Sequence, residues 1–514
     1  MTPESDPRLL YALLAPLLGA GLVMVTGKKP NLREAVSFIA ACTLFGFVAS
    51  LIPDVLAKKV VHFTIFQLIP ADGAGFYQGL SLSLRADGLS MVFAVAASFL
   101  WMLAVFYAMG YMRAHHEANQ TRFNACFALA LFGAVGGAFA DNLLTLYFFY
   151  EIVSVSTYPL VAHHQDEESY EGAQKYLVYL TTTAKAFILP AMVLIYVLSG
   201  TLDFAQNANV GILPAGVHNG IVIALYIACI LGFAKNGVMP FHSWLPSAMV
   251  APTPVSALLH AVAVVKIGVF ATVRVMLYIF GVDLMDRLHL GLPTACFVSI
   301  TILLGSVIAL SKDNLKARLA YSTVSQLSYV ILGVALLNPI GIEGGLFHIA
   351  AHAFSKITLF FCAGAIYIVT HKKNISEMGG LGRQMPWTFG AFAVAALSMI
   401  GAPPVAGFVS KLYMLVGSME AHSYFILAVL IGSSLLNAAY FAPVVYHAFF
   451  GKPAVAAAAH GADAHHGDSH GHDDGHHGEA PLSMLIPLCI TAAISVAIGI
   501  YPDLIMQFVK GIAQ

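Results

Sequence analysis

One apolar stretch carries three titratable side chains at regular helical spacing. His348, His352 and Lys356 stand at positions i, i+4 and i+8. On an α-helix they form one stripe, with neighbours about 6 Å apart. Bridging waters make such a row suitable for passing protons. Metal binding by the two histidines is the competing interpretation, but no HExxH pattern or nearby carboxylate accompanies them. The spacing favours a proton wire.

Further ionisable side chains stand inside other apolar stretches. They are Glu151, Lys185, Lys235, His260, Lys266 and Lys411. An ionisable group at bilayer depth costs a few kcal/mol at least, so each is a functional candidate. Burial disfavours the charged form of lysine, which lets the side chain lose and regain a proton. This set predicts proton handling within a membrane rather than a structural scaffold.

Glu151 lies mid-helix and needs a cation in order to ionise, and we expect Lys235 to supply it. The alternative for Glu151 is a neutral carboxyl group that is hydrogen-bonded to a neighbouring helix. The alternative for Lys411 is a side chain that extends to the membrane interface. Three interpretations of Lys185 stay open: it pairs with Glu151, it is a further relay point, or its role is structural. His260 and Lys266 are six residues apart, which places them about 120° apart around one helix. This spacing predicts that they do not share one face of the helix and that they relay a proton across it.

The composition excludes a water-soluble enzyme. Of 514 residues, 59% are hydrophobic and only 10% are charged, against about 25% charged in soluble domains. The net charge of −1 leaves no basic surface for nucleic acid, and the six cysteines form no CxxC pair. No nucleotide-binding glycine loop or cofactor ligand set is recognisable, so we expect no cofactor, no metal and no redox or hydrolytic site of its own. The chain is predicted to be a polytopic membrane protein.

Scanning with a window of about 20 apolar residues predicts fourteen transmembrane helices. They lie near 9–26, 35–56, 88–112, 123–140, 142–162, 172–199, 219–238, 253–280, 291–310, 317–337, 343–370, 386–417, 423–449 and 482–506. Residues 60–85 alternate instead and predict an extramembrane β-hairpin. The N-terminus lacks the features of a cleaved signal, so the first helix is expected to stay.

Basic residues are unequally shared between the two sets of loops. One side carries Lys28, Lys29, Arg33, Arg113, Arg122, Lys312, Lys316, Arg318, Lys372, Lys373, Arg383 and Lys452. The other carries Arg8, Lys58, Lys59, Arg85, Arg287 and Lys510. The positive-inside rule therefore places the first side in the cytoplasm of a bacterial inner membrane, with both termini extracytoplasmic.

Two of the expected helices are interrupted by glycine and proline next to a lysine. The seventh contains Gly232–Pro240 with Lys235, and the twelfth contains Gly401–Gly407 before Lys411. Ordinary proline kinks are the alternative to two inverted five-helix repeats. The repeats predict four segments: 1–112 with the hairpin, 113–280 as the first repeat, 281–422 as most of the second, and 423–514 with a His-rich loop at 453–480. That loop predicts a solvated linker, or else loose metal binding or proton buffering.

Four runs of residues form long signatures. They are Met239–Lys266 (MPFHSWLPSAMVAPTPVSALLHAVAVVK), Asp313–Tyr329 (DNLKARLAYSTVSQLSY), Leu346–Lys356 (LFHIAAHAFSK) and Gly379–Pro386 (GGLGRQMP). Over about residues 80–450 the chain resembles the antiporter-like subunits shared by respiratory complex I, Mrp-type sodium/proton antiporters and energy-converting membrane hydrogenases. With lysine rather than glutamate at 411, it is most similar to the D-type subunit of Mrp antiporters. Lys185, the His-rich loop and Ser355 depart from the family pattern.

The resemblance implies a role for each matched position. It implies an all-α bundle in which Glu151 and Lys235 form the charged pair, His260 and Lys266 the central relay, His348, His352 and Lys356 the connecting wire, and Lys411 the terminal lysine. The expected function is proton translocation within a multi-subunit Mrp-type cation/proton antiporter, with other membrane subunits, lipid, protons and Na+ as partners. A pumping subunit of a redox complex, a membrane partner in an inorganic-carbon uptake complex and a stand-alone transporter of a small solute are the alternatives. The identity of the cation and the direction of flux stay open.

Overall fold

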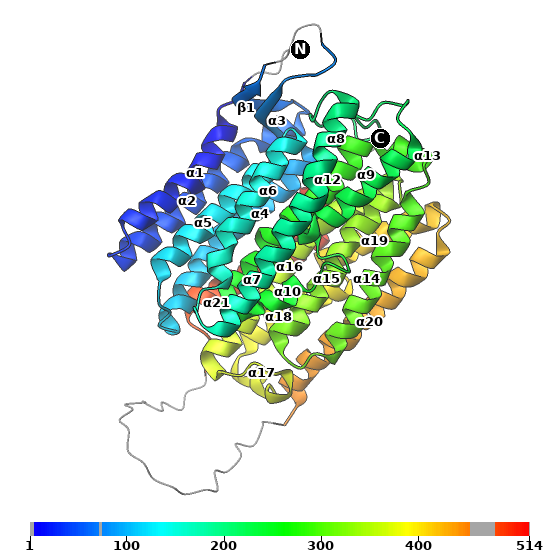
Figure 1. Ribbon diagram of the computed structural model, residues 1–514. Helices are drawn as coiled ribbons and strands as arrows, with labels where there is room; N and C mark the ends of the chain where they lie inside the picture. Colours follow the sequence, from blue (N-terminus) through cyan, green and yellow to red (C-terminus); the bar gives the residue numbers. More distant parts are fainter. Residues whose placement is uncertain (1–4, 71–74, 453–477, 513–514) are drawn as a thin grey trace, which may run out of the picture.

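The computed structural model describes residues 5–70, 75–452 and 478–512. Within this part, the chain is a bundle of long helices with one two-stranded hairpin at its end (Figure 1). Among the described residues, eleven helical segments are long and apolar enough to cross a membrane. The other three expected spans are also helical, and they correspond to α9, α15 and the pair α18–α19. The predicted all-α polytopic membrane fold is confirmed.

The described residues of the first half of the chain form the hairpin and thirteen α-helices. They are α1 (Arg8–Val25), α2 (Pro30–Ser50), α3 (Ile52–Leu56), β1 (Val61–Ile69), β2 (Leu80–Ala86), α4 (Gly88–Ala114), α5 (Gln120–Ala138), α6 (Leu143–Val161), α7 (Glu167–Thr183), α8 (Leu189–Ser199), α9 (Asn219–Gly232), α10 (Trp244–Ser247), α11 (Thr253–Ala257), α12 (Val264–Val275) and α13 (Val282–Arg287). Short turns connect several of them: η1 (Ala184–Ile188), η2 (Ala234–Asn236), η3 (Ala248–Val250), η4 (Leu258–Val262) and η5 (Met276–Phe280).

The second half is helical throughout the part that the structure describes. Its elements are α14 (Gly291–Ser311), α15 (Leu315–Ala335), α16 (Pro339–Thr370), η6 (Ile375–Glu377), α17 (Leu381–Gln384), α18 (Pro386–Ile400), α19 (Ala406–Glu420), α20 (Tyr424–Phe450), α21 (Leu482–Ile500) and α22 (Asp503–Val509). Most of the expected His-rich loop, residues 453–477, lies outside the described residues.

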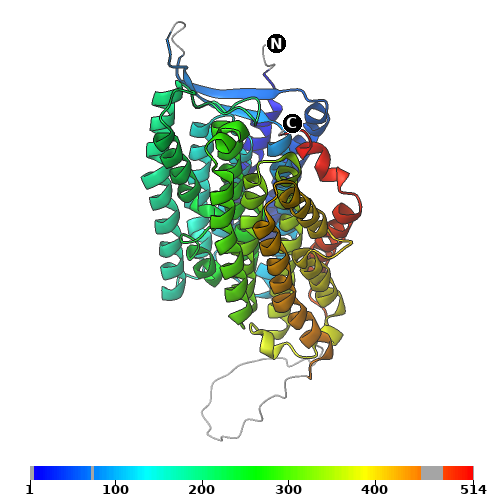
Figure 2. The ribbon, with the colours of Figure 1, turned by 90° about the vertical axis from the view of Figure 1, so that its right-hand side faces the viewer.

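The predicted hairpin is confirmed. β1 pairs with β2 in antiparallel register from Val61 opposite Ala86 to Ile69 opposite Leu80. The hairpin lies across one end of the bundle, whereas α17 lies at the other end (Figure 2). We call these ends the hairpin face and the pocket face, the latter for a cavity described below. The two sets of loops that differ in their number of basic residues lie on these two faces. The set with more lysine and arginine residues lies on the pocket face.

Both expected interruptions are present. α9 ends at Gly232, and a single 3₁₀ turn carrying Lys235 follows it, closed by Gly237 at φ +73°. α18 ends at Ile400, Gly401 adopts φ +92°, and α19 resumes at Ala406. Positive φ is a conformation that glycine tolerates without steric cost, which explains why glycine stands at both breaks. The inverted relation between the two halves stays a prediction.

Three π-helical turns were not expected from the sequence. They are η1, which contains Lys185, η4, which contains His260, and η5. Each π turn inserts backbone that shifts the phase of the helix after it, and such turns are frequent at functional sites. Two of the three therefore coincide with ionisable residues inside predicted spans.

Two spans form the centre of the bundle and carry most of the candidate residues. The span Thr253–Phe280, built from α11, η4, α12 and η5, is buried along its whole 18-residue apolar window, and the window of α16 is 78% buried. The outer spans α1, α2 and α20 keep many exposed apolar side chains, as lipid-facing helices do. A span that carries ionisable side chains belongs at the centre, because there neighbouring helices rather than lipid surround those side chains.

Candidate functional site

A direct contact joins the two central spans. Lys266 on α12 and His352 on α16 are both buried, and Lys266 Nζ lies 2.8 Å from His352 Nδ1. A lysine amine and an imidazole nitrogen at this distance share one hydrogen bond, so a proton can be transferred between them. The other ring nitrogen of His352 has no partner among the described residues.

The predicted stripe on α16 continues this contact. The rings of His352 and His348 are 6.0 Å apart. His348 Nδ1 lies 2.8 Å from Ser410 Oγ on α19, and its Nε2 lies 3.1 Å from Gln326 Oε1 on α15. Both histidines are fully buried and held by polar groups from neighbouring helices. The stripe therefore leads from the central contact toward the second broken helix.

Lys411 lies at that broken helix. Its Nζ donates to the carbonyl oxygens of Met399 at 2.7 Å and Ile400 at 3.0 Å. These carbonyls lie in the last turn of α18, where the interruption leaves them without helical donors. Nζ also lies 5.0 Å from the centre of the Tyr329 ring, and that ring is 5.6 Å from the His348 ring. Tyr329 therefore stands between the stripe and Lys411.

Lys356 forms a branch of the stripe. It donates to Ser322 Oγ on α15 at 2.9 Å, and Tyr440 on α20 donates to the same hydroxyl at 3.0 Å. Lys356 is fully buried, and it forms no ion pair with any described carboxylate. A buried lysine that is solvated only by hydroxyl and carbonyl oxygens is not locked in the charged state.

The expectation that His260 and Lys266 lie on different faces is wrong. His260 packs on Phe360 of α16, with ring centres 4.9 Å apart, and Lys266 contacts His352 of the same helix. His260 lies in the π turn η4, so the regular α-helical rotation on which the expectation was based does not apply between the two residues. Both ring nitrogens of His260 lack partners among the described residues, so they are available to water.

The expected direct pair between Glu151 and Lys235 is also not formed. Lys235 Nζ donates to the backbone carbonyl of Tyr150 and lies 3.3 Å from the centre of the Tyr150 ring. Glu151, the next residue on α6, is half-buried, and its Oε1 has no partner among the described atoms. Lys235 emerges from the break after α9, so its chain geometry directs it to the carbonyl rather than to the carboxylate. Among the described residues, no hydrogen bond or ion pair joins the Glu151 carboxylate to Lys235.

Sequence reasoning missed several side chains that complete the site. Those in direct contact with the predicted residues are Tyr150, Ser322, Gln326, Tyr329 and Ser410. Gln326 and Tyr329 belong to one of the signature runs, and a glutamine inside an expected spanning helix is a signal that was available. The role of Tyr150 had no such signal, because aromatic residues are common in spanning helices.

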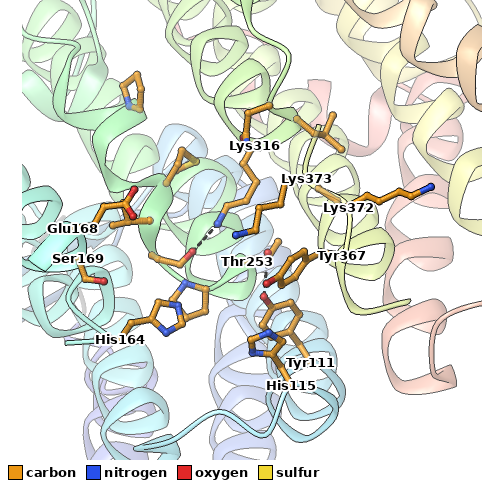
Figure 3. A pocket seen from close by; sticks show the side chains of 18 of the residues that line it. Tyr111, His115, His164, Glu168, Ser169, Thr253, Lys316, Tyr367, Lys372 and Lys373 are labelled. Atoms are coloured by element: carbon orange, nitrogen blue, oxygen red, sulfur yellow. Dashed lines mark hydrogen bonds between the residues drawn. The ribbon is translucent and has the colours of Figure 1, made fainter. Parts of the chain in front are cut away.

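A polar cavity of about 520 Å³ opens on the pocket face (Figure 3). Lys316 Nζ reaches into it and donates to the carbonyl of Ala251 at 2.6 Å. Thr253 lies at its wall, where its hydroxyl is 3.5 Å from the hydroxyl of Tyr111. Thr253 begins α11, and η4 with His260 follows directly. The cavity thus brings a polar surface to the start of the central span.

A carboxylate ringed by histidines stands at the edge of this cavity. Glu117 lies 3.0 Å from His115 Nδ1, 3.5 Å from His163 Nε2 and 3.7 Å from His164 Nδ1. Burial raises the pKa of Glu117, but the histidines outweigh burial and hold the pKa below its usual value. For His164, burial dominates and lowers the pKa. Among the described residues, no group of three ligands is arranged to hold a metal ion.

Family comparison agrees with this geometry. The family described as "NADH:quinone oxidoreductase/Mrp antiporter, TM" matches residues 140–437, and the complex I family described as "chain 5 N-terminus" matches residues 77–124. The first match covers more than half of the chain and includes every predicted site residue. The chain belongs to this family of antiporter-like membrane subunits.

Curated relatives come from both branches of the family. The chain is 33% identical to NADH-quinone oxidoreductase subunit N of Desulforudis audaxviator, over 83% of each chain. It is 31% identical to NADH-quinone oxidoreductase subunit L of Mycobacterium tuberculosis, over 90% of this chain and 72% of that one. It is 31% identical to a putative antiporter subunit mnhA2 of Staphylococcus epidermidis, over 78% of this chain and 51% of that one.

Solved structures show the same fold. A chain of the Mrp complex from Dietzia superposes with a TM-score of 0.83 at 22% identity, covering 99% of this chain and 96% of that one. A chain of the archaeal membrane-bound sulfane sulfur reductase superposes with a TM-score of 0.81, also at 22% identity, covering 98% and 96%. Together with the family match, these findings identify an antiporter-like subunit of Mrp/complex I-like membrane complexes.

Proposed function

We propose that this chain translocates protons as the antiporter-like subunit of an Mrp-type monovalent cation/proton antiporter. The observation that carries the proposal is the buried contact of 2.8 Å between Lys266 and His352. It lies in a series of titratable groups running to His348 and on toward Lys411. A structural core gains nothing from such a series, because each group costs free energy to bury.

In the proposed path, protons enter through the cavity on the pocket face. Lys316 and the hydroxyl groups of Thr253 and Tyr111 offer polar sites along its wall. Water carries the proton on to His260, whose two ring nitrogens lack protein partners among the described residues. From there the proton reaches Lys266 and His352, and the α16 stripe carries it toward Lys411.

In the proposed coupling, Glu151 and Lys235 control the entry of protons into this series. Lys235 is solvated by the Tyr150 carbonyl and ring rather than by a carboxylate. Its proton affinity therefore responds to the charge of Glu151 through space. When a neighbouring subunit changes its own charge near Glu151, the free energy of holding a proton on Lys235 changes, by about 1.4 kcal/mol for each tenfold change in affinity.

The proposed setting is a bacterial inner membrane, with the pocket face in the cytoplasm. The excess of basic residues on that face supports this orientation. Na+ is the candidate cation for exchange, and other membrane subunits of the complex are the candidate partners. Assignment to the D-type subunit of such an antiporter belongs to the same proposal and rests on Lys411 and the signature runs.

The test is proton transport by the whole complex in proteoliposomes, read with a pH-sensitive dye while a cation gradient is applied. We expect Lys266→Met and Lys235→Ala to abolish transport while the complex still assembles. Lys510→Met is the matched control, because Lys510 is an exposed lysine that pairs with Asp503. Transport at the wild-type rate by an assembled Lys266→Met complex would overturn the proposed path.

A second candidate function is favoured by the comparison with NADH-quinone oxidoreductase subunit N, which covers 83% of that relative at 33% identity. In this alternative, the same proton path serves a redox complex, and electron transfer in partner subunits supplies the energy. Gentle purification from native membranes followed by mass spectrometry separates the two. Small multi-spanning subunits without redox proteins support the antiporter, whereas co-purifying iron–sulfur or quinone-site subunits support the pump.

A further inference from the structure

Tyr440 on α20 lies between two polar side chains that can both accept its hydroxyl proton. Its hydroxyl oxygen is 3.0 Å from Ser322 Oγ on α15 and 2.5 Å from Asn437 Oδ1, which is three residues earlier on α20. Ser322 Oγ also accepts a hydrogen bond from Lys356 Nζ at 2.9 Å. All four side chains are fully buried. Because the Tyr440 hydroxyl has one proton and two acceptors, it donates to one of them at a time.

The hydrogen bonds continue from Asn437 to the second broken helix. Asn437 Nδ2 donates to the carbonyl oxygen of Met399 at 3.1 Å, and the same oxygen accepts from Lys411 Nζ at 2.7 Å. Gln326 Nε2 is a third donor to it, at 3.4 Å. A carbonyl oxygen has two lone pairs, so the three donors compete for it. A stronger bond from Asn437 therefore weakens the bond between the Met399 carbonyl and Lys411.

The charge of Lys356 determines which way the hydroxyl groups point. Among the described residues, the Ser322 proton has two acceptors within reach, Lys356 Nζ and the Tyr440 oxygen. An ammonium group accepts no hydrogen bond. A charged Lys356 therefore directs the Ser322 proton to Tyr440, and the Tyr440 proton then goes to Asn437. A neutral Lys356 has a lone pair that accepts the Ser322 proton, which leaves Tyr440 free to donate to Ser322.

Two further titratable groups lie near this connection. Arg318 Nη1 donates to the backbone carbonyl of Tyr440 at 2.9 Å, and the ring centre of Tyr329 lies 5.0 Å from Lys411 Nζ. Arginine stays protonated in proteins, and a tyrosine hydroxyl stays neutral near pH 7. Of the described groups that face Tyr440, Lys356 is therefore the one whose charge can change.

We propose that Tyr440 and Asn437 are positioning residues that couple the charge of Lys356 to proton release from Lys411. A proton that arrives on Lys356 turns the Tyr440 hydroxyl toward Asn437. The Asn437 amide is then polarised and donates more strongly to the Met399 carbonyl, because hydrogen bonds in a chain reinforce one another. Lys411 is held less tightly in its charged form and releases its proton.

This connection transmits a change in hydrogen-bond direction rather than a proton. An amide side chain and a backbone carbonyl do not titrate near neutral pH, so no proton has to pass Asn437. The connection thus adds to the α16 stripe, which carries the proton itself. The inference rests on the proposed function, since it takes Lys356 and Lys411 as groups that bind and release protons.

The experiment measures the rate of proton transport by the whole complex in proteoliposomes as a function of pH. Tyr440→Phe keeps the ring and removes the hydroxyl. On the acid limb of the profile, where release from Lys411 limits the rate, we expect the pH of half-maximal transport to rise by about 0.5 to 1 unit, one unit being a tenfold change in proton affinity. Tyr107→Phe is the matched control, because Tyr107 on α4 is also fully buried and donates to the Phe361 carbonyl at 2.7 Å. Its limb should coincide with that of the wild type.

Asn437→Leu removes the next link and should shift the acid limb in the same direction. The double variant Tyr440→Phe/Asn437→Leu should shift it no further than Asn437→Leu alone, since both changes act through one connection. If Tyr440→Phe lowers the rate equally at every pH and leaves the limb in place, the hydroxyl serves packing only and the coupling is wrong. Additive shifts in the double variant would also contradict it.

Lys411→Met separates a failure of this inference from a failure of the proposed function. If an assembled Lys411→Met complex transports protons at the wild-type rate, the proposed path is wrong and the coupling is wrong with it. If Lys411→Met is inactive while Tyr440→Phe leaves the acid limb unshifted, the path stands and the coupling alone is overturned.

Discussion

At the residue scale, three buried lysines of this protein are solvated by neutral oxygens and aromatic rings rather than by carboxylates. Lys411 rests on two carbonyl oxygens, Lys356 on a serine hydroxyl and Lys235 on a carbonyl and a tyrosine ring. An ion pair would hold a lysine permanently charged, because its partner would be left as an uncompensated buried charge on deprotonation. Neutral acceptors stabilise the charged form less, which suits groups that must give up a proton.

Tyr150 provides a test of this solvation. Its ring centre lies 3.3 Å from Lys235 Nζ, and its hydroxyl accepts a hydrogen bond from the Lys235 backbone N–H at 3.2 Å. We expect Tyr150→Leu to slow proton transport by about tenfold or more, because a desolvated cation–π contact contributes about 2 kcal/mol. Tyr150→Phe keeps the ring and should retain most of the transport rate.

The measurement is the initial rate of proton uptake by proteoliposomes with matched amounts of complex. If Tyr150→Phe and Tyr150→Leu lose transport equally, the hydroxyl rather than the ring supports Lys235. That outcome would contradict the role assigned to the ring.

At the element scale, helix breaks and π turns bring the titratable side chains to one another. The break after α9 frees Lys235 from its helix, and the break after α18 frees the carbonyls that receive Lys411. His260 lies in the π turn η4 and packs against Phe360 of α16. Packing in a membrane does not require breaks or π turns, because regular helices would pack equally well. These irregular segments therefore indicate functional positions.

Gly268 on α12 provides a test at this scale. A Cβ atom added there would clash with the backbone of Lys235 and Asn236. We expect Gly268→Ala to displace the 3₁₀ turn η2 and reduce transport severely, since backbone cannot move aside as a flexible side chain can. Gly432→Ala on α20 is the control, because its Cβ would meet no atom within 4 Å.

Transport rate and the amount of assembled complex are measured together for both variants. A Gly268→Ala complex that assembles and transports as the wild type does would show that the close approach of α12 and η2 is dispensable.

At the scale of the whole molecule, a network of charges ties the hairpin to the helices at the hairpin face. Arg274 of α12 donates to Asp87 at 2.6 Å, and Arg85 of β2 lies 3.4 Å from Asp87 and 3.3 Å from Asp141. His62 of β1 lies 2.9 Å from Asp141. Four segments that are distant in sequence meet here, so the network fixes the hairpin across the end of the bundle.

Asp87 makes the stability of this network dependent on pH. Burial raises the pKa of Asp87, but Arg274 and Arg85 outweigh burial and lower the pKa to about 2 from 3.8. Because the folded value lies below the unfolded one, the stabilisation is complete above about pH 4 and is lost as the pH falls toward 2. The shift corresponds to about 2 kcal/mol.

We therefore expect Asp87→Asn to lower the melting temperature of the detergent-solubilised complex at pH 7, and this difference to shrink as the pH falls from 4 to 2. Asp503→Asn is the control, since the Asp503 side chain is 83% exposed and its pair with Lys510 contributes little. A constant difference at all pH values would show that Asp87 acts through packing rather than through charge.

The sequence by itself determined the class of fold, the hairpin, both helix breaks and the buried titratable residues. Each of these depends on local properties: apolar length, alternation, glycine with proline, and ionisable residues within apolar runs. The stripe of His348, His352 and Lys356 followed from helical spacing alone. Only the tertiary structure decided which groups touch, because contacts between helices depend on phase and crossing. In the folded chain His260 and Lys266 both contact α16, Lys235 contacts Tyr150 rather than Glu151, and Lys185 faces outward.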